Sequence, residues 1–323
     1  MEAHPKEKRF NEVRYPHFHC KITVSTAFRW PDPRYSNIPV LVWEFDRGML
    51  EARPYLWDGN QGVITLSTFN AEYFRKIVPA GMPVWQVRPP LSLDRPPEIS
   101  VEKVRAKWEI GKDDFCVFYN FSYASSYFRK NPEGLLKAFA ATFAGNARAK
   151  LLLKTSGQKH AAAMQQRLLG LIRQLGVSPQ VRVIDDHLSR EDMLALMSAS
   201  DCYASLHRGE GVGLGMVESM ALGRPVIATS FGGNTDFTRN DTAKMIGYRM
   251  VPQAENDQSD YRFVDRWPEP DINEAAAAMR DLYEQPEAAA GLGARGRDFI
   301  HDYLHISHFR EDIEKVMQGC NEQ

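Results

Sequence analysis

The stretch from Arg208 to Thr229, RGEGVGLGMVESMALGRPVIAT, predicts a glycine-rich loop followed by a helix and a buried strand. Glycine recurs at every second position from Gly209 to Gly215, and residues without side chains let backbone N–H groups approach a ligand closely. The helix behind the loop offers unpaired N–H donors and the positive end of its dipole. Gly223 ends the helix, and the strand begins at Val226. The stretch therefore predicts an anion-binding site at a helix N-terminus.

Two glutamates frame this loop. Glu210 opens it, and Glu218 lies about one turn into the helix. Because carboxylates repel phosphate, we expect them to accept hydrogen bonds from hydroxyl groups of the ligand. A ligand with a diphosphate between two polyols is a nucleotide sugar. The alternative, a loop residue at the surface and a glutamate on a solvated helix face, is disfavoured by the glycine spacing and the helix start.

The same stretch resembles the E-x7-E motif of retaining GT-B glycosyltransferases, specifically glycosyltransferase family 4, whose usual form reads EGFGLPxLEAMAxGxPVIAS. The segments from His187 to His207, from Ser230 to Phe237 and from Trp267 to Asp271 also resemble the family pattern. The resemblance implies an α/β fold of GT-B type, in which two Rossmann-like, doubly wound domains face a cleft. It also implies a glycosyltransferase of the hexosyltransferase type.

The resemblance implies roles for individual residues of the motif. Glu210 orients the hydroxyl groups of the donor sugar, and Glu218 binds the ribose hydroxyls. The departing diphosphate is stabilised by backbone amides of the turn, which are those of Gly211, Val212, Gly213 and Leu214. The acceptor attacks on the face from which the leaving group departs.

A basic pair, Arg129 and Lys130, precedes a helix that we expect to begin near Asn131, with Pro132 in its first turn. Lys130 resembles the family lysine that meets the donor diphosphate, and such a charge stabilises a departing anion without a metal. The alternative is an exposed basic helix start, which the positive dipole end disfavours. The family often has glycine-arginine directly after the preceding strand, whereas this chain has Asn120-Phe121-Ser122. One basic contact to the donor is therefore absent or supplied differently.

Other segments bear on the donor base and on metals. The loop from Ile184 to His187 resembles the family segment that contacts the nucleobase, which implies donor contacts at Asp185 and Asp186; turn and cap roles explain these two equally well. The sequence contains no D-x-D motif, so we expect no metal and no cofactor, with a UDP-, GDP- or ADP-sugar as the donor substrate. Three roles stay open for His17 and His19, which are lining the cleft, binding a metal and making structural hydrogen bonds. The last is the most common role of two histidines in an extended segment.

Composition agrees with a two-domain α/β enzyme, since 43% of the 323 residues are hydrophobic. The formal net charge of −1 argues against a nucleic-acid partner. Four scattered cysteines without C-x-x-C spacing fit reduced thiols in a cytoplasmic protein. No apolar run in the sequence is long enough to cross a bilayer, so we expect at most peripheral contact with the inner face of a membrane.

We divide the chain into an N-terminal acceptor-side domain at residues 1–99, a nucleotide-sugar-binding domain at 100–297, and a C-terminal helix at 298–323 that packs back toward the first domain. The proline-rich residues 88–99 form the predicted linker. Expected strands of the first domain are Lys21–Ser25, Pro39–Trp43, Val63–Leu66 and Val84–Val87. Those of the second begin with Asp114–Tyr119, Leu151–Lys154, Val181–Ile184 and Cys202–Ser205 and alternate with helices, which predicts a parallel sheet.

The first domain looks incomplete, because a doubly wound domain has about six strands. We expect either a piece of a longer chain or a short natural member that self-associates or pairs with another polypeptide. Two functions of different class remain open. One is a retaining transferase that moves a sugar to a saccharide or lipid-linked acceptor, as in polysaccharide synthesis. The other is a nucleotide-sugar-binding module without turnover.

Overall fold

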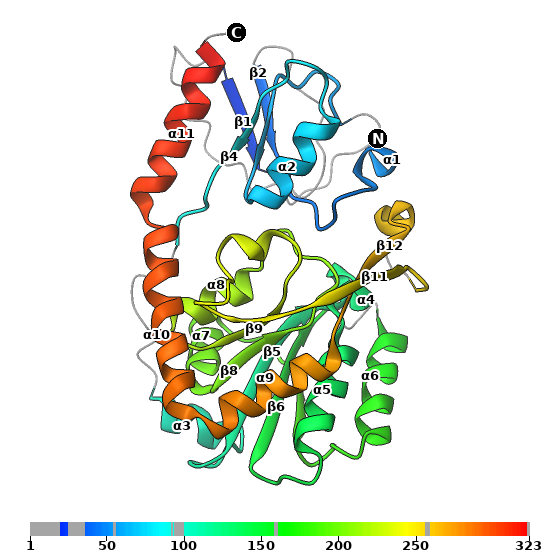
Figure 1. Ribbon diagram of the computed structural model, residues 1–323, viewed down its shortest axis with the longest axis vertical. Coiled ribbons are helices and arrows are strands. Elements are labelled where there is room, and N and C mark those ends of the chain that lie inside the picture. The colour runs from blue at the N-terminus through cyan, green and yellow to red at the C-terminus, as the bar shows by residue number, and fades with distance from the viewer. Residues whose placement is uncertain are drawn as a thin grey trace.

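The computed structural model describes residues 20–24, 36–53, 56–91, 93, 100–157, 161–255 and 259–321. Two α/β domains lie one above the other, the smaller N-terminal domain at the top of Figure 1 and the larger domain below it. The chain passes downward after β4, and helices α10 and α11 return along one edge of the molecule to the upper domain. His17, His19 and residues 94–99 of the predicted linker lie outside the described residues.

The N-terminal domain contains a parallel sheet whose strands follow chain order. Its described strands are β1 (Cys20–Val24), β2 (Ser36–Val40), β3 (Val63–Thr65) and β4 (Val84–Gln86). All four expected strands are confirmed in type, although β2 begins three residues before the expected Pro39. Helix α1 (Met49–Ala52) is short, and α2 (Thr68–Ile77) begins where the Ser67 hydroxyl accepts a hydrogen bond from the Asn70 N–H.

The second domain is a doubly wound, six-stranded parallel sheet. Its strands are β5 (Phe115–Ser122), β6 (Ala149–Ser156), β7 (Val181–Ile184), β8 (Cys202–Ser205), β9 (Val226–Thr229) and β10 (Lys244–Ile246). Their spatial order, β7-β6-β5-β8-β9-β10, is the 3-2-1-4-5-6 order of a Rossmann fold. The strand order reverses between β5 and β8, and ligands of such folds bind at the carboxyl ends of the strands beside that reversal.

Helices cover both faces of this sheet (Figure 1). They are α3 (Val101–Lys107), α4 (Tyr127–Lys130), α5 (Pro132–Phe143), α6 (Ala162–Gln174), α7 (Arg190–Ala199), α8 (Leu214–Ala221), α9 (Ile272–Glu284) and α10 (Pro286–Tyr303). As expected, α5 begins with Pro132 behind the cap residue Asn131. The central strand β5 is buried along most of its length, which explains its nearly continuous apolar sequence. An antiparallel pair, β11 (Tyr248–Pro252) and β12 (Arg266–Pro270), lies beside the sheet.

The described chain ends in two helices rather than the single C-terminal helix that we predicted at residues 298–323. Helix α10 stops at Tyr303, and α11 (Ile306–Asn321) continues after Leu304 and His305. The boundary at residue 298 therefore falls inside α10. Helix α11 packs Val316 against Ile38 and Ile64 of the N-terminal sheet, and Asp312 pairs with Arg88 at 2.8 Å. In the part of the chain that the structure describes, no helix has the length and apolarity to cross a membrane.

Candidate active site

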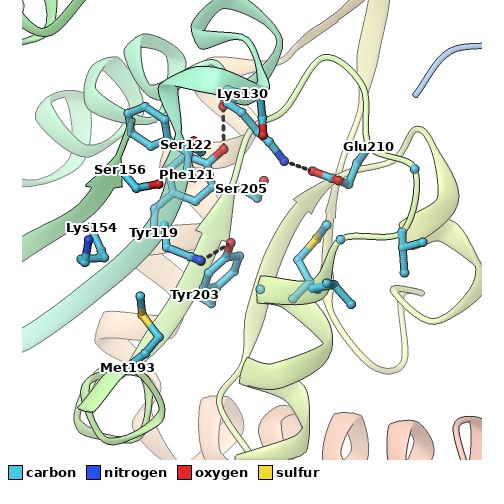
Figure 2. A pocket seen from close by; sticks show the side chains of 18 of the residues that line it. Tyr119, Phe121, Ser122, Lys130, Lys154, Ser156, Met193, Tyr203, Ser205 and Glu210 are labelled. Atoms are coloured by element: carbon cyan, nitrogen blue, oxygen red, sulfur yellow. Dashed lines mark hydrogen bonds and ion pairs between the residues drawn. The ribbon is translucent and has the colours of Figure 1, made fainter. Parts of the chain in front are cut away.

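A pocket of about 740 Å³ opens at the carboxyl ends of β5, β6 and β8, beside the strand reversal. The second domain contributes most of its lining, including Lys130, Lys154 and Glu210, which project from different strands and loops (Figure 2). The N-terminal domain closes one side with Val42 and Glu44. The cavity therefore lies between the two domains.

The glycine-rich loop takes the predicted form. Helix α8 begins at Leu214 behind Gly213, whose φ of 93° lies in the left-handed region that favours glycine. No side chain caps this helix, so its first N–H groups face the pocket that Gly213, Leu214 and Gly215 line. At Gly211 a Cβ atom would lie 2.2 Å from the Val42 side chain. That glycine is thus required by the close approach of the N-terminal domain.

Lys130 and Glu210 meet in the pocket. The Lys130 Nζ donates to Oε2 of Glu210 at 2.5 Å, across the strand reversal from the loops after β5 and β8 (Figure 2). The Tyr119 hydroxyl donates to the Lys130 carbonyl at 2.7 Å and fixes the backbone of the lysine. The sequence placed both residues in the site, and the structure brings their charged ends together.

Both charges are largely buried, and the pair is ionised. Burial alone would raise the pKa of Glu210, but Lys130, Arg129 and His207 outweigh it and lower this pKa to about 2. Burial lowers the pKa of Lys130, while Glu210 opposes that change. An ionised carboxylate beside an ammonium leaves two ammonium protons for an anionic ligand in the same pocket.

Arg129 points away from the pocket, in contrast to its neighbour. Its guanidinium is 3% exposed and donates to the carbonyls of Gly209 and Ser125, at 2.7 and 2.8 Å. It lies 3.4 Å from Glu44 of the N-terminal domain and 3.9 Å from Glu210. The structure therefore gives Arg129 the position of a buried cross-link between the domains, one that also holds the loop of Glu210.

The remaining predicted residues lie at the margin of the site. The Asp185 carboxylate accepts hydrogen bonds from Thr155 and from Gln165, the latter at 2.6 Å. Asp186 is exposed, and the pocket is lined by the next two residues of that loop. Glu218 forms an ion pair with Arg190 of α7 and is not among the residues that line the cavity.

Sequence reasoning missed three parts of the site. Lys154, at the end of β6, lines the cavity from the side opposite Glu210 (Figure 2). His207 is fully buried behind Glu210, and its Nε2 faces the Phe231 carbonyl and the Asn234 side-chain oxygen at 3.0 and 3.1 Å. Two acceptors there fix the proton on Nε2, and burial lowers the pKa of this histidine, which is neutral.

Asp236 is the third missed residue, and it ties the domains together. Its Oδ2 accepts hydrogen bonds from the Thr68 N–H at 2.8 Å, the Gln86 amide at 3.2 Å and the Tyr303 hydroxyl at 3.2 Å. Thr68 begins α2, so the carboxylate also sits at the N-terminus of a helix in the opposite domain. Burial raises the pKa of Asp236. Within the described residues, no group of histidine, cysteine and acidic side chains has a metal-binding arrangement.

A doubly wound domain that faces a smaller parallel α/β domain across a cleft is the arrangement of the GT-B fold, the fold of the glycosyltransferases that this chain resembles. Anabaena HepE, solved in complex with UDP and glucose, superimposes with a TM-score of 0.69 at 15% identity over 88% of this chain and 72% of that one. Sucrose-phosphate synthase from Thermosynechococcus elongatus superimposes with a TM-score of 0.66 at 18% identity, over 88% of this chain and 68% of that one. At such low sequence identity, both similarities show a shared fold and nothing about activity.

The sequence comparisons name the family. Residues 100–260, just under half of the chain, match the family model described as Glycosyl transferases group 1. A curated relative, D-inositol 3-phosphate glycosyltransferase of Corynebacterium diphtheriae, is 32% identical over 105 residues, which are 32% of this chain and 24% of the relative. The chain thus aligns with about a quarter of the length of that relative. The fold is therefore of the GT-B type, and residues 100–260 carry the sequence pattern of the Glycosyl transferases group 1.

Proposed function

We propose that the chain transfers a hexosyl group, with retention of configuration, from a nucleoside-diphosphate sugar to a saccharide or lipid-linked acceptor. The observation that carries this proposal is the convergence of Lys130 and the uncapped N-terminus of α8 on one pocket. An ammonium and free backbone N–H groups together form a site for a diphosphate. Glu210, held in place by Lys130, faces the same space and accepts hydrogen bonds from sugar hydroxyls.

The reaction assigned to this site breaks one C–O bond and forms another. The bond between the anomeric carbon and the diphosphate oxygen breaks as the amides of Gly213 to Gly215 and Lys130 take up the developing negative charge. An acceptor hydroxyl forms the new bond on the same face of the sugar, and its proton passes to the departing diphosphate. Because protein cations supply the positive charge, we expect no dependence on a divalent metal.

The domains divide the substrates between them in this proposal. Residues 100–297 bind the donor, and residues 1–99 supply the acceptor side, with Glu44 and Val42 facing the pocket. Residues 298–323 tie the C-terminus to the first domain. The UDP and glucose bound by Anabaena HepE support a nucleotide sugar as the donor class. Self-association and peripheral membrane contact stay predictions, which light scattering and vesicle sedimentation test.

Calorimetric titration tests the binding half of this proposal. UDP, GDP and ADP are titrated into the wild type, Lys130→Met and Lys137→Met, where Lys137 is an exposed lysine of α5 that serves as the matched control. Loss of a charge-assisted hydrogen bond should weaken the bound nucleotide about tenfold to a hundredfold in Lys130→Met. The control should bind as the wild type does. Equal affinity in both lysine variants would contradict the proposal.

Donor turnover tests the catalytic half. UDP-, GDP- and ADP-glucose are incubated with the protein, with and without saccharide acceptors, and release of the nucleoside diphosphate is followed. Removal of one preorganised donor typically lowers a rate about a hundredfold to a thousandfold, so Lys130→Met should show such a loss. Tight nucleotide binding without any release would instead assign the chain as a nucleotide-sugar-binding module.

A further inference from the structure

A second cation in the pocket has no role in the reaction proposed above. Lys154 is the third residue from the end of β6 and is 6% exposed. It lines the cavity together with Thr155 and Ser156. It lies across the pocket from the Lys130–Glu210 pair, near Met193 of α7 (Figure 2). Lysine is rarely so buried unless its charge is paired.

The ammonium of Lys154 lacks such a pair. Its Nζ donates to the Thr155 carbonyl at 2.5 Å; within the described residues no carboxylate oxygen lies within 4.0 Å of it, although Asp185 and Asp186 attract its charge from farther away. The nearby Asp185 carboxylate accepts from Thr155 and Gln165 instead. Because a buried charge is costly without a full set of hydrogen bonds, the remaining protons of Lys154 call for an acceptor supplied by a ligand.

The sheet determines which end of a nucleotide sugar reaches Lys154. Helix α8 follows β8, and β5 separates β8 from β6. Neighbouring strands lie about 4.8 Å apart, so Lys154 stands about 10 Å across the sheet from the strand that leads into α8. With the diphosphate on the α8 N-terminus and the sugar beside Glu210, the nucleoside is the part of the donor that extends toward β6 and β7.

The surroundings of Lys154 suit a flat base. Met193 lies near Lys154 in the cavity (Figure 2), and Leu188 is a further apolar residue of its lining. An ammonium only donates hydrogen bonds, so its partner on the base must be an acceptor. Guanine has a keto oxygen at C6 where adenine has an amino group, which is a donor, and uracil has keto oxygens at C2 and C4.

We propose that Lys154 donates a hydrogen bond to a keto oxygen of the donor nucleobase and thereby selects uracil or guanine over adenine. This assignment rests on the proposed binding of a nucleoside diphosphate in the pocket. It gives the chain a specificity residue on β6, distinct from the residues that hold the diphosphate.

The test compares base preference rather than affinity alone. UDP, GDP and ADP are titrated into the wild type, Lys154→Met and Lys150→Met by calorimetry, after thermal melting has confirmed folding. Lys150 is the matched control, because it lies on the same face of β6 and contacts Asp114 at the opposite end of the strand, at 4.0 Å. Lys154→Gln, which keeps an N–H donor without the charge, is the second variant.

The wild type should bind UDP or GDP at least about tenfold more tightly than ADP. Lys154→Met should lose this preference by weakening the keto nucleotide about tenfold or more while leaving ADP nearly unchanged, and Lys154→Gln should retain part of it. Lys150→Met should behave as the wild type. Equal weakening of all three nucleotides by Lys154→Met would place the lysine on the diphosphate and overturn the assignment, as would an unchanged preference. Absence of binding by all three nucleotides would overturn the proposed function as well.

Discussion

Replacing Lys130 by methionine should show how much the ion pair between Lys130 and Glu210 contributes to the free energy of unfolding. The Glu210 side chain is 14% exposed, and after the substitution Arg129, at 3.9 Å, is the one cation that stays beside it among the described residues. We therefore expect the pKa of Glu210 to rise from about 2 toward its ordinary value of 4.5.

The magnitude follows from that pKa. A fall from 4.5 to about 2 corresponds to about 3 kcal/mol in favour of the ionised carboxylate in the folded chain. Several neighbours share this energy, and Lys130 has the largest favourable part, so Lys130→Met should lower the free energy of unfolding by about 2 kcal/mol near neutral pH. Because the folded pKa is depressed, this stabilisation is present above 4.5 and is lost as the pH falls through about 2.

Urea denaturation of the wild type, Lys130→Met, Glu210→Gln and the double variant measures the coupling between the two side chains. We expect a coupling energy of about 2 kcal/mol near neutral pH that falls by about a third at about pH 3 and by more than half at about pH 2.5. Lys137→Met is the control for loss of a surface lysine. A coupling energy below about 0.5 kcal/mol, or one independent of pH, would refute this account of the pair.

Three further results are expected. Arg129→Met should lower the free energy of unfolding by about 3–5 kcal/mol in urea denaturation, because it leaves Glu44 without its buried partner and removes the second cation beside Glu210; a loss below about 1 kcal/mol would count against the cross-link. Glu218→Gln should weaken UDP or GDP about tenfold in calorimetry if this carboxylate holds the ribose, and an unchanged Kd would remove it from the site. Asp236→Ala should speed hydrogen exchange at the Thr68 amide about tenfold or more, since that N–H loses its acceptor, and unchanged exchange would show that the domains are held elsewhere.

The sequence was sufficient to predict the strands and helices of the second domain, because the patterns that indicate them are local in the sequence. Alternating apolar strands and capped helices predicted β5 to β9 within a few residues, and the glycine-rich loop predicted the helix behind it, which is α8. The family resemblance also pointed to Glu210 in that loop and to Lys130 before α5, and the structure places the Lys130 Nζ 2.5 Å from Oε2 of Glu210. Their pairing depends on β5 and β8 being neighbours, which is a property of the parallel topology.

Other features depend on orientation and burial, which sequence patterns do not encode. Arg129 and Lys130 are consecutive basic residues, yet the turn between Ser126 (φ 72°) and Asn131 (φ 49°) directs one into the domain interface and the other into the pocket. Lys154 is a lysine near a strand end like many others, and only the fold reveals that it is buried in the cavity. The short connection between α10 and α11 contains no glycine or proline, so the sequence carries no signal for a helix end there and the two terminal helices were predicted as one.

The most direct test of the account is a crystal structure of the protein soaked or grown with UDP or GDP. We predict the diphosphate at the N-terminus of α8, within hydrogen-bond distance of the amides of Gly213 to Gly215 and of the Lys130 ammonium, with the base directed toward Lys154. A diphosphate bound in any other cavity, with the space between Lys130 and α8 left to solvent, would contradict the central claim that this pocket is the donor site.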